Sequence, residues 1–479
     1  MRLGLRCVVS LVSALMIGAG MGSLPAVAAD VSFSAPNLVA VFASGSGNPF
    51  GMARADFDRD GHTDLAIPNQ ATDDVSVLLG NGIGGFSVVG TFRVGSLPAG
   101  VAVGDFNRDK LPDLAVANAV DDNVSVLLGD GRGRFSPPTN FSVGPGAGIQ
   151  PTGIAAGDFN ADGRPDLAVS NEGASGVSLL LGDGTGGFAA ARTFGGGGLT
   201  MTLGDFNGDH RLDVATAHSD NNIVSVLLGD GTGGLATQRV FPAGGVTPGS
   251  ITADDLNGDN HPDLVVGLIS SPSATVSVLL GDGTGNFGSP ILFPAGRNPT
   301  AVAVADYDRD GHRDLAVANR GDRNVSLLLG DGAAHFTTPS NFAVGFSPHA
   351  AVTGDFNEDG KPDLAFAGTS PGAALLLNTT LTPSLTITPA SGSQGTTVTV
   401  RGFGYTPGST IPIVKFVVPP TFGRKGSYTA ICSTAVASDG TFLCRGQIPT
   451  GTAAGSRGAH RIVAKDSTGL KAATTFNLT

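Results

Sequence analysis

The sequence predicts an all-β protein, built as a seven-bladed β-propeller followed by a small β-sandwich. Three observations lead to this fold class. A nine-residue acidic segment recurs seven times, at spacings of 49, 53, 47, 50, 51 and 49 residues. Short apolar runs with the two-residue period of β-strands flank each copy. The 479 residues also include 73 Gly and 29 Pro, which indicates many turns between short strands.

The composition limits the class of protein before any motif is considered. With 41% hydrophobic residues, the chain is too apolar to remain disordered, and its glycines lack the three-residue period of collagen. The net charge is −12, whereas nucleic-acid binding requires a basic surface, so we expect no nucleic-acid partner. We also expect no transmembrane segment, because no run beyond the N-terminus is long and apolar enough.

Residues 1–29 are predicted to be a secretory signal peptide. Arg2 and Arg6 precede an apolar run that is too short to span a bilayer, and small residues follow up to Ala29. We therefore expect a secreted protein, extracellular or held at the cell surface. Without the two arginines the chain has 26 basic and 40 acidic side chains, which is a net charge of −14.

Each repeat predicts four short antiparallel strands. In the second repeat, small residues from Gly100 to Gly104 precede the acidic segment, and the alternating run Leu114–Ala117 follows it. Val124–Leu128 and a strand that begins at Phe135 complete the unit. Seven such units match a propeller with seven four-stranded blades, in which the small residues of the first strand line the crowded central channel.

The ends of the repeat region, residues 30–378, predict a closed ring. The seventh repeat stops at Leu375–Asn378 without a fourth strand. The segment Phe33–Val41 resembles the fourth-strand segment of the second repeat. We expect this N-terminal segment to complete the seventh blade and to cover its open edge. An open solenoid is the alternative.

The acidic segments predict metal-binding loops. Asp occupies positions 1, 5 and 9 in all seven copies, and position 3 is Asp or Asn. Oxygen atoms at positions 1, 3, 5 and 9, with a backbone carbonyl at position 7, can converge on one ion when the chain curls. Oxygen ligands without His or Cys side chains favour calcium. The alternative is seven solvated acidic turns, in which the clustered carboxylates would repel each other.

We therefore predict up to seven structural calcium ions, whose charge would neutralise the −14 of the exported chain. The predicted side-chain ligands are Asp56, Asp58, Asp60 and Asp64; Asp105, Asn107, Asp109 and Asp113; Asp158, Asn160, Asp162 and Asp166; Asp205, Asn207, Asp209 and Asp213; Asp255, Asn257, Asp259 and Asp263; Asp306, Asp308, Asp310 and Asp314; and Asp355, Asn357, Asp359 and Asp363. The predicted carbonyl ligands are those of His62, Leu111, Arg164, Arg211, His261, His312 and Lys361.

Position 6 is Gly in four of these loops, where a tight turn calls for a positive φ. Lys110 and His210 stand there in the second and fourth loops, and neither residue type adopts a positive φ readily. We expect these two loops to bind calcium more weakly.

The repeats resemble the FG-GAP or VCBS class, which occurs in integrin α-subunit propellers and in bacterial secreted proteins. The resemblance rests on the seven segments from DFDRDGHTD at Asp56 to DFNEDGKPD at Asp355. It implies calcium between the first and second strands on one face of the ring. It also implies a protein or glycan ligand on the opposite face, near connections such as Asn69–Asp74 and Asn118–Asn123. The fold does not identify that ligand.

Residues 379–479 predict a separate domain, because the fifty-residue period ends there. The segment TITPASGSQGTTVTVRGFGY resembles the start of bacterial Ig-like or IPT/TIG domains, and about 100 residues is usual for such a β-sandwich. Cys432 and Cys444 are the only cysteines after the signal peptide, and export favours a disulfide between them. We expect a hairpin that turns at Ser438–Gly440 to bring them together. Two buried free thiols are the alternative.

Together these features predict a non-catalytic binding or adhesion module. We expect no enzyme, because the sequence shows no Ser/His/Asp or paired-Glu arrangement. A carbohydrate-binding lectin is one alternative, although the absence of Trp and the presence of only three Tyr leave few platforms for sugar stacking. A polysaccharide-acting enzyme on the same scaffold is less expected, because it needs a cluster of basic and acidic residues at one end of the channel.

Overall fold

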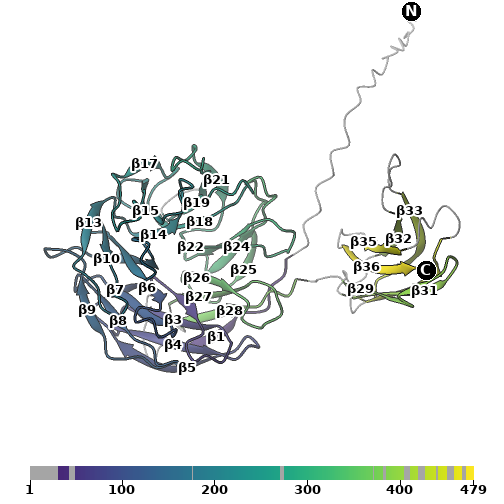
Figure 1. Cartoon of the computed structure of the whole chain (residues 1–479), viewed down its shortest axis with the longest axis horizontal. Helices are drawn as coiled ribbons and strands as arrows, with labels where there is room; N and C mark the ends of the chain where they lie inside the picture. Colours follow the sequence, from purple (N-terminus) through teal and green to yellow (C-terminus); the bar gives the residue numbers. More distant parts are fainter. Residues whose placement is uncertain are drawn as a thin grey trace, which may run out of the picture. The chain divides into compact units, whose positions relative to one another are not determined.

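The computed structural model describes residues 31–41, 49–174, 176–269, 275–369, 372–380, 384–403, 410–418, 427–437, 441–449, 458–465 and 471–479. The predicted signal peptide lies outside these residues. The chain forms two compact units, one of Asp30–Leu381 and one that contains Thr382–Thr479. Throughout the described ranges the regular elements are β-strands (Figure 1). No helix that could cross a membrane occurs in them.

The described part of the first unit contains seven four-stranded antiparallel sheets, which we call blades 1 to 7. Blades 1 to 3 consist of β2 (Ala53–Ala55), β3 (Asp64–Asn69), β4 (Asp74–Gly80) and β5 (Phe86–Arg93); β6 (Pro98–Gly104), β7 (Asp113–Asn118), β8 (Asn123–Leu127) and β9 (Thr139–Ser142); and β10 (Pro151–Gly157), β11 (Asp166–Asn171), β12 (Gly176–Leu180) and β13 (Arg192–Gly195). Blades 4 to 6 consist of β14 (Thr200–Gly204), β15 (Asp213–His218), β16 (Ile223–Leu227) and β17 (Arg239–Pro242); β18 (Pro248–Asp254), β19 (Asp263–Leu268), β20 (Thr275–Leu279) and β21 (Ile291–Pro294); and β22 (Pro299–Ala305), β23 (Asp314–Asn319), β24 (Asn324–Leu328) and β25 (Ser340–Ala343). Blade 7 consists of β26 (Pro348–Gly354), β27 (Asp363–Gly368), β28 (Gly372–Leu376) and β1 (Asn37–Ala40).

The second and third strands of each blade supply most of the core. In β7, the residues from Leu114 to Ala117 are fully buried, and so are Val124 and Leu127 in β8. These side chains pack between neighbouring blades, as the alternation of apolar residues in the sequence predicts. The all-β propeller predicted from the repeats is therefore the fold of the first unit.

The blades form a closed ring (Figure 1). Among the described residues, five of the junctions repeat one backbone contact. In the junction between blades 1 and 2, the N–H of Gly133 donates to the carbonyl of Phe57 at 3.0 Å. The Phe57 ring also packs edge-on against Phe135 of blade 2. The junction between blades 7 and 1 repeats this arrangement, because Gly84 donates to the carbonyl of Phe356 at 3.0 Å.

The N-terminal strand completes blade 7, which confirms the predicted closure. Strand β1 pairs antiparallel with β28, with Asn37 opposite Leu375. The N–H of Ser34 also donates to the carbonyl of Leu377 at 2.8 Å. The N–H of Thr379 donates to the carbonyl of Ser32 at 2.8 Å, so the pairing continues past residue 378. The alternative of an open solenoid is wrong.

The second unit is a small β domain with two sheets around one core. The sheets are β29 (Ser384–Thr388), β31 (Thr397–Phe403) and β34 (Phe442–Gln447), and β30 (Ser391–Gly392), β36 (Lys471–Leu478), β35 (Gly458–Lys465), β32 (Thr410–Val418) and β33 (Ser427–Ala435). Val400 from the first sheet and Phe416 and Phe476 from the second are fully buried in the shared core.

A disulfide joins the two sheets. Cys432 in β33 and Cys444 in β34 are bonded, with their Cα atoms 6.0 Å apart. The predicted hairpin between them is wrong, because β33 pairs with β32 and β34 pairs with β31. The predicted turn at Ser438–Gly440 lies outside the described residues. The two cysteines meet because the chain crosses from one sheet to the other, and both side chains then belong to the core between the sheets.

Candidate metal centres

All seven acidic loops connect the first strand of a blade to its second strand. Loop 1 begins at Asp56, directly after β2, and ends at Asp64, which is the first residue of β3. The other six loops have the same register. Because neighbouring strands in a blade are antiparallel, the loops lie at one face of the ring. The connections between second and third strands, and those between blades, lie at the opposite face.

Two left-handed residues curl each loop. At position 6, φ lies between 63° and 96° in all seven loops, and Lys110 and His210 adopt this conformation like the glycines. At position 4, φ lies between 57° and 76° in all seven loops. Sequence reasoning missed position 4, because glycine stands there in only two loops while Arg59, Arg108 and Arg309 occupy three others.

The curl turns the first three acidic side chains toward the backbone of their own loop. In loop 1, Asp56 accepts hydrogen bonds from the N–H groups of Asp60 and Gly61 at 3.1 and 3.0 Å. Asp58 accepts from Asp60 at 3.2 Å, and Asp60 accepts from His62 at 2.8 Å. Loops 3 to 7 contain the equivalent bonds. Backbone donors therefore hold the carboxylates close to one another.

The aspartate at position 9 also links its loop to the third strand of the blade. It is fully buried in all seven blades. Asp113 accepts the N–H of Phe106 at position 2, at 2.9 Å, and the N–H of Gly129 after the third strand, at 2.8 Å. In blade 7, Asn378 donates in place of that glycine, at 2.7 Å. This structural role is a finding that the sequence pattern did not indicate.

Burial makes the position-9 aspartates weaker acids. Burial raises the pKa to about 6 in five of them: Asp64, Asp113, Asp213, Asp263 and Asp363. It raises the pKa of Asp314 to about 7. The two backbone donors oppose this shift, whereas the other carboxylates of the loop add to it. A cation among these groups would favour their ionised forms.

In loops 1 and 6, three carboxylates come together. Carboxylate oxygens of Asp56, Asp58 and Asp64 lie within 4.8 Å of one another. The same holds for Asp306, Asp308 and Asp314. These are the two loops with Asp rather than Asn at position 3. The structure thus brings positions 1, 3 and 9 together, whereas the position-5 carboxylate turns to the N–H of position 7.

Loop 6 provides the sharpest test of whether these residues fit a cation. Asp308 is only 8% exposed, and its Oδ2 atom has no hydrogen-bond partner. Burial, followed by the charges of Asp314 and Asp310, raises the pKa of Asp308 to about 7. A buried carboxylate oxygen without a donor is costly, and a bound cation removes that cost. The donors at positions 1, 3 and 9 therefore fit a divalent ion that prefers oxygen.

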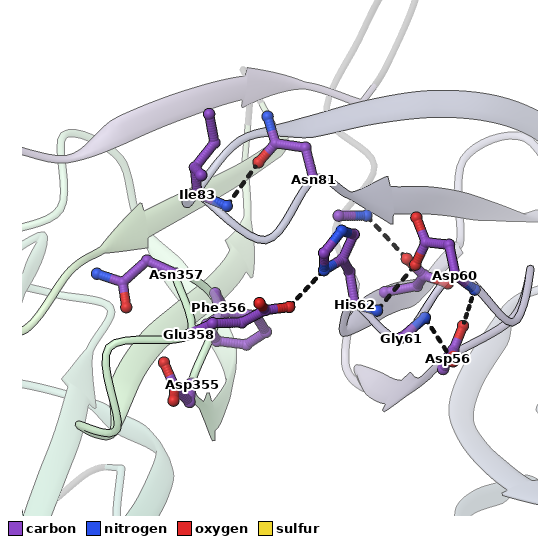
Figure 2. A network of polar contacts seen from close by, with 12 residues as sticks. Asp56, Asp60, Gly61, His62, Asn81, Ile83, Asp355, Phe356, Asn357 and Glu358 are labelled. Atoms are coloured by element: carbon purple, nitrogen blue, oxygen red, sulfur yellow. Dashed lines mark hydrogen bonds and ion pairs between the residues drawn. The ribbon is translucent and has the colours of Figure 1, made fainter.

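The loops of blades 7 and 1 contact each other where the ring closes. Figure 2 shows Nδ1 of His62, at position 7 of loop 1, bonded to Oε1 of Glu358, at position 4 of loop 7. This hydrogen bond raises the pKa of His62. The contact joins the two loops directly, so the first and last candidate sites belong to one continuous acidic face.

Known structures share this fold at low sequence identity, which shows the fold alone. BBS1N in complex with ARL6DN is 14% identical, with 74% of this chain and 97% of that chain covered and a TM-score of 0.51. A putative 6-phosphogluconolactonase from Bacteroides uniformis is 15% identical, with 63% and 86% covered and a TM-score of 0.50.

Comparison of the sequence gives a more specific result. No curated protein matches the chain. The FG-GAP-like repeat, however, matches residues 56–116, 105–169, 158–216, 205–266, 255–317 and 306–366. Each match runs from one acidic loop through the next, and together they cover more than half of the chain. The protein therefore belongs to the FG-GAP-like repeat family.

Proposed function

We propose that this protein is an exported, calcium-binding β-propeller that acts as a non-catalytic extracellular binding or adhesion module. The observation that carries the proposal is the contrast between its two faces. The nine-residue loops are uniform in all seven blades, whereas the connections at the opposite face vary. Eight residues join β9 to β10, for example, and four join β13 to β14. Variable connections on a rigid scaffold are the usual location of a recognition site.

Calcium is the proposed structural ion of the acidic loops. Its positive charge would offset the clustered carboxylates of positions 1, 3 and 9. The same side chains connect the end of the first strand to the start of the second, and position 9 extends this connection to the third strand. The unpartnered Oδ2 of Asp308 supports the proposal most directly.

Thermal unfolding in calcium and in the chelator EGTA tests the metal assignment. Binding to the folded state alone stabilises it by mass action, by about 2.7 kcal/mol per site at a hundredfold excess over the dissociation constant. We expect a lower Tm in EGTA, and restoration when calcium is added in excess. Magnesium serves as the matched control ion. An equal Tm in calcium and EGTA would contradict the assignment.

The second unit is proposed to be an Ig-like β-sandwich that serves as a spacer or a second contact. Its two sheets around one core, and the disulfide between them, support this assignment. The disulfide also suits a protein that folds outside the reducing cytoplasm, in agreement with the proposed export.

A binding assay tests the function itself. The chain from residue 30 onward, immobilised in calcium, is exposed to a glycan array and to purified cell-surface proteins. Selective capture that EGTA abolishes would support the module, and capture of one sugar class would identify a lectin. A folded, calcium-stabilised protein that binds nothing in either assay would count against the proposal.

A further inference from the structure

A cavity of about 230 Å³ opens on the face opposite the acidic loops. It lies where the first strands of blades 2, 3 and 4 begin, and these strands, β6, β10 and β14, are neighbours around the ring (Figure 1). Its walls include Phe50, Leu97, Ala99, Val120, Leu199 and Glu172. The cavity thus belongs to the variable face and is separated from the acidic loops by the length of a strand, roughly 20 Å.

The walls of this cavity are mainly apolar and accessible. Phe50 is 45% exposed, Leu97 is 40% exposed and Val120 is 64% exposed. Large apolar side chains gathered at one hollow on a surface mark a place where a ligand or partner can bury them. An apolar stem of a ligand would therefore be stabilised along these walls.

Glu172 adds one negative charge to the cavity. Its carboxylate is half-buried, and this burial raises its pKa. Ser219 Oγ donates to its Oε1 at 3.3 Å, while nearby Asp220 raises the pKa further. In the part of the chain that the structure describes, Glu172 forms no ion pair. A carboxylate in such surroundings is stabilised by a cation from outside the chain.

The acidic side chain at this place is specific to one blade. It directly follows the last residue of the second strand, Asn171. None of the equivalent residues in the other six blades is acidic; they are Gln70, Ala119, Ser219, Ile269, Arg320 and Thr369. The repeat pattern therefore does not require an acid here, and turn formation does not explain it.

We propose that this cavity binds a lysine side chain presented by a partner protein. The aliphatic stem would lie against Leu97, Val120 and Phe50, and the ammonium group would pair with Glu172. Ser219 Oγ lies 3.3 Å from Oε1, so a two-pronged guanidinium would have to share that oxygen, whereas the ammonium group of lysine can pair with Oε2 alone. This inference rests on the proposed binding function and names the chemistry of its partner.

Binding of four short peptides to the intact chain from residue 30 onward tests this proposal. The peptides share a Gly-Ser framework and carry lysine, Nε-acetyl-lysine, norleucine or arginine at the centre, and NMR titration measures their affinity in calcium. We expect the lysine peptide to bind best. Glu172→Gln should weaken its binding about tenfold or more, because a hydrogen bond between charged groups contributes about 1.5–3 kcal/mol.

Asp220→Asn is the matched control. It removes the same charge from the exposed neighbour of Ser219, and we expect less than a twofold change in affinity. Both variants should keep the Tm of the parent in calcium, which excludes misfolding. Equal binding of the lysine peptide to the parent and to Glu172→Gln would overturn the proposal, and so would stronger binding of norleucine or arginine. Butylamine, which has the same aliphatic stem and ammonium group as a lysine side chain, is also titrated. If it binds as tightly as the lysine peptide, the cavity is a site for small amines and the proposal of a protein partner is wrong.

The two proposals fail in different ways. If the lysine peptide does not bind while the glycan array or the cell-surface proteins give selective capture, the lysine pocket is wrong and the binding module stands. If neither assay gives binding by a folded, calcium-stabilised chain, both are wrong.

Discussion

Position 6 of the acidic loops shows how single residues determine loop stability. Lys110 has a φ of 68° and Gly61 has a φ of 93°. A left-handed conformation costs an ordinary residue about 1–2 kcal/mol, while glycine loses about 0.5–1 kcal/mol through its greater freedom when unfolded. Lys110→Gly should therefore raise the free energy of unfolding by about 0.5–1 kcal/mol, as measured by urea unfolding in EGTA.

Gly61→Ala is the reverse experiment and its control. A Cβ atom added at Gly61 meets nothing within 4 Å, so only the backbone conformation determines the outcome. We expect this variant to lower the free energy of unfolding by about 1 kcal/mol. A change of the same sign in both variants would contradict the explanation by backbone strain.

The burial of His349 predicts that the folded state becomes less stable in acid. This side chain is 4% exposed, and its ring lies 6.1 Å from that of Phe50. Burial, with a smaller effect from Arg320, lowers the pKa of His349 to about 4. The folded state thus favours the neutral ring. The stability that the neutral ring contributes is fully present above the pKa of histidine in the unfolded chain, about 6.5. This contribution is lost as the pH falls toward 4.

The change that isolates this effect is His349→Gln. Between pH 7 and pH 4, the variant should lose less unfolding free energy than the parent, by as much as about 3 kcal/mol. Urea unfolding at a series of pH values measures the difference. A variant at position 349 that follows the parent curve would show that the pKa of this ring does not differ between the folded and unfolded states.

At the scale of strands, β1 holds the ring closed. It supplies the fourth strand of blade 7 and covers the edge of β28. A chain that begins at residue 42 would expose that edge to other molecules. We expect this truncation to lower the Tm and to produce self-association in size-exclusion chromatography with light scattering. A chain that begins at residue 30 is the control, and a truncated chain that stays monomeric with the same Tm would contradict the role of β1.

Sequence reasoning succeeded where the chain repeats itself. Seven copies reveal the strand pattern, the acidic loops and the missing fourth strand of blade 7, because each copy confirms the others. It failed at position 4, where only two loops have the glycine that indicates a left-handed residue and three have arginine. It also failed at the cysteines, because the pairing of β33 with β32 depends on strands distant in sequence and occurs in a unit without repeats. Local patterns do not contain that information.

At the scale of the whole molecule, the seven loops should not bind calcium equally. Loops 1 and 6 have an aspartate at position 3 and bring three carboxylates together, whereas the other five have asparagine there. Calcium affinity rises with the number of charged ligands. Calorimetric titration of the calcium-free chain should therefore show two classes of site, about two tight ones and a weaker remainder.

Exchange of the position-3 residues tests which loops form the tight class. The double variant Asp58→Asn with Asp308→Asn should abolish the tight class without changing the total number of sites. Asn160→Asp, in a loop that already has Gly163 at position 6, should add one tight site. If the double variant leaves the titration unchanged, ligand charge at position 3 does not set the affinity. The left-handed residues that curl every loop would then be the determinant, and Lys110→Gly would be the variant that tightens binding.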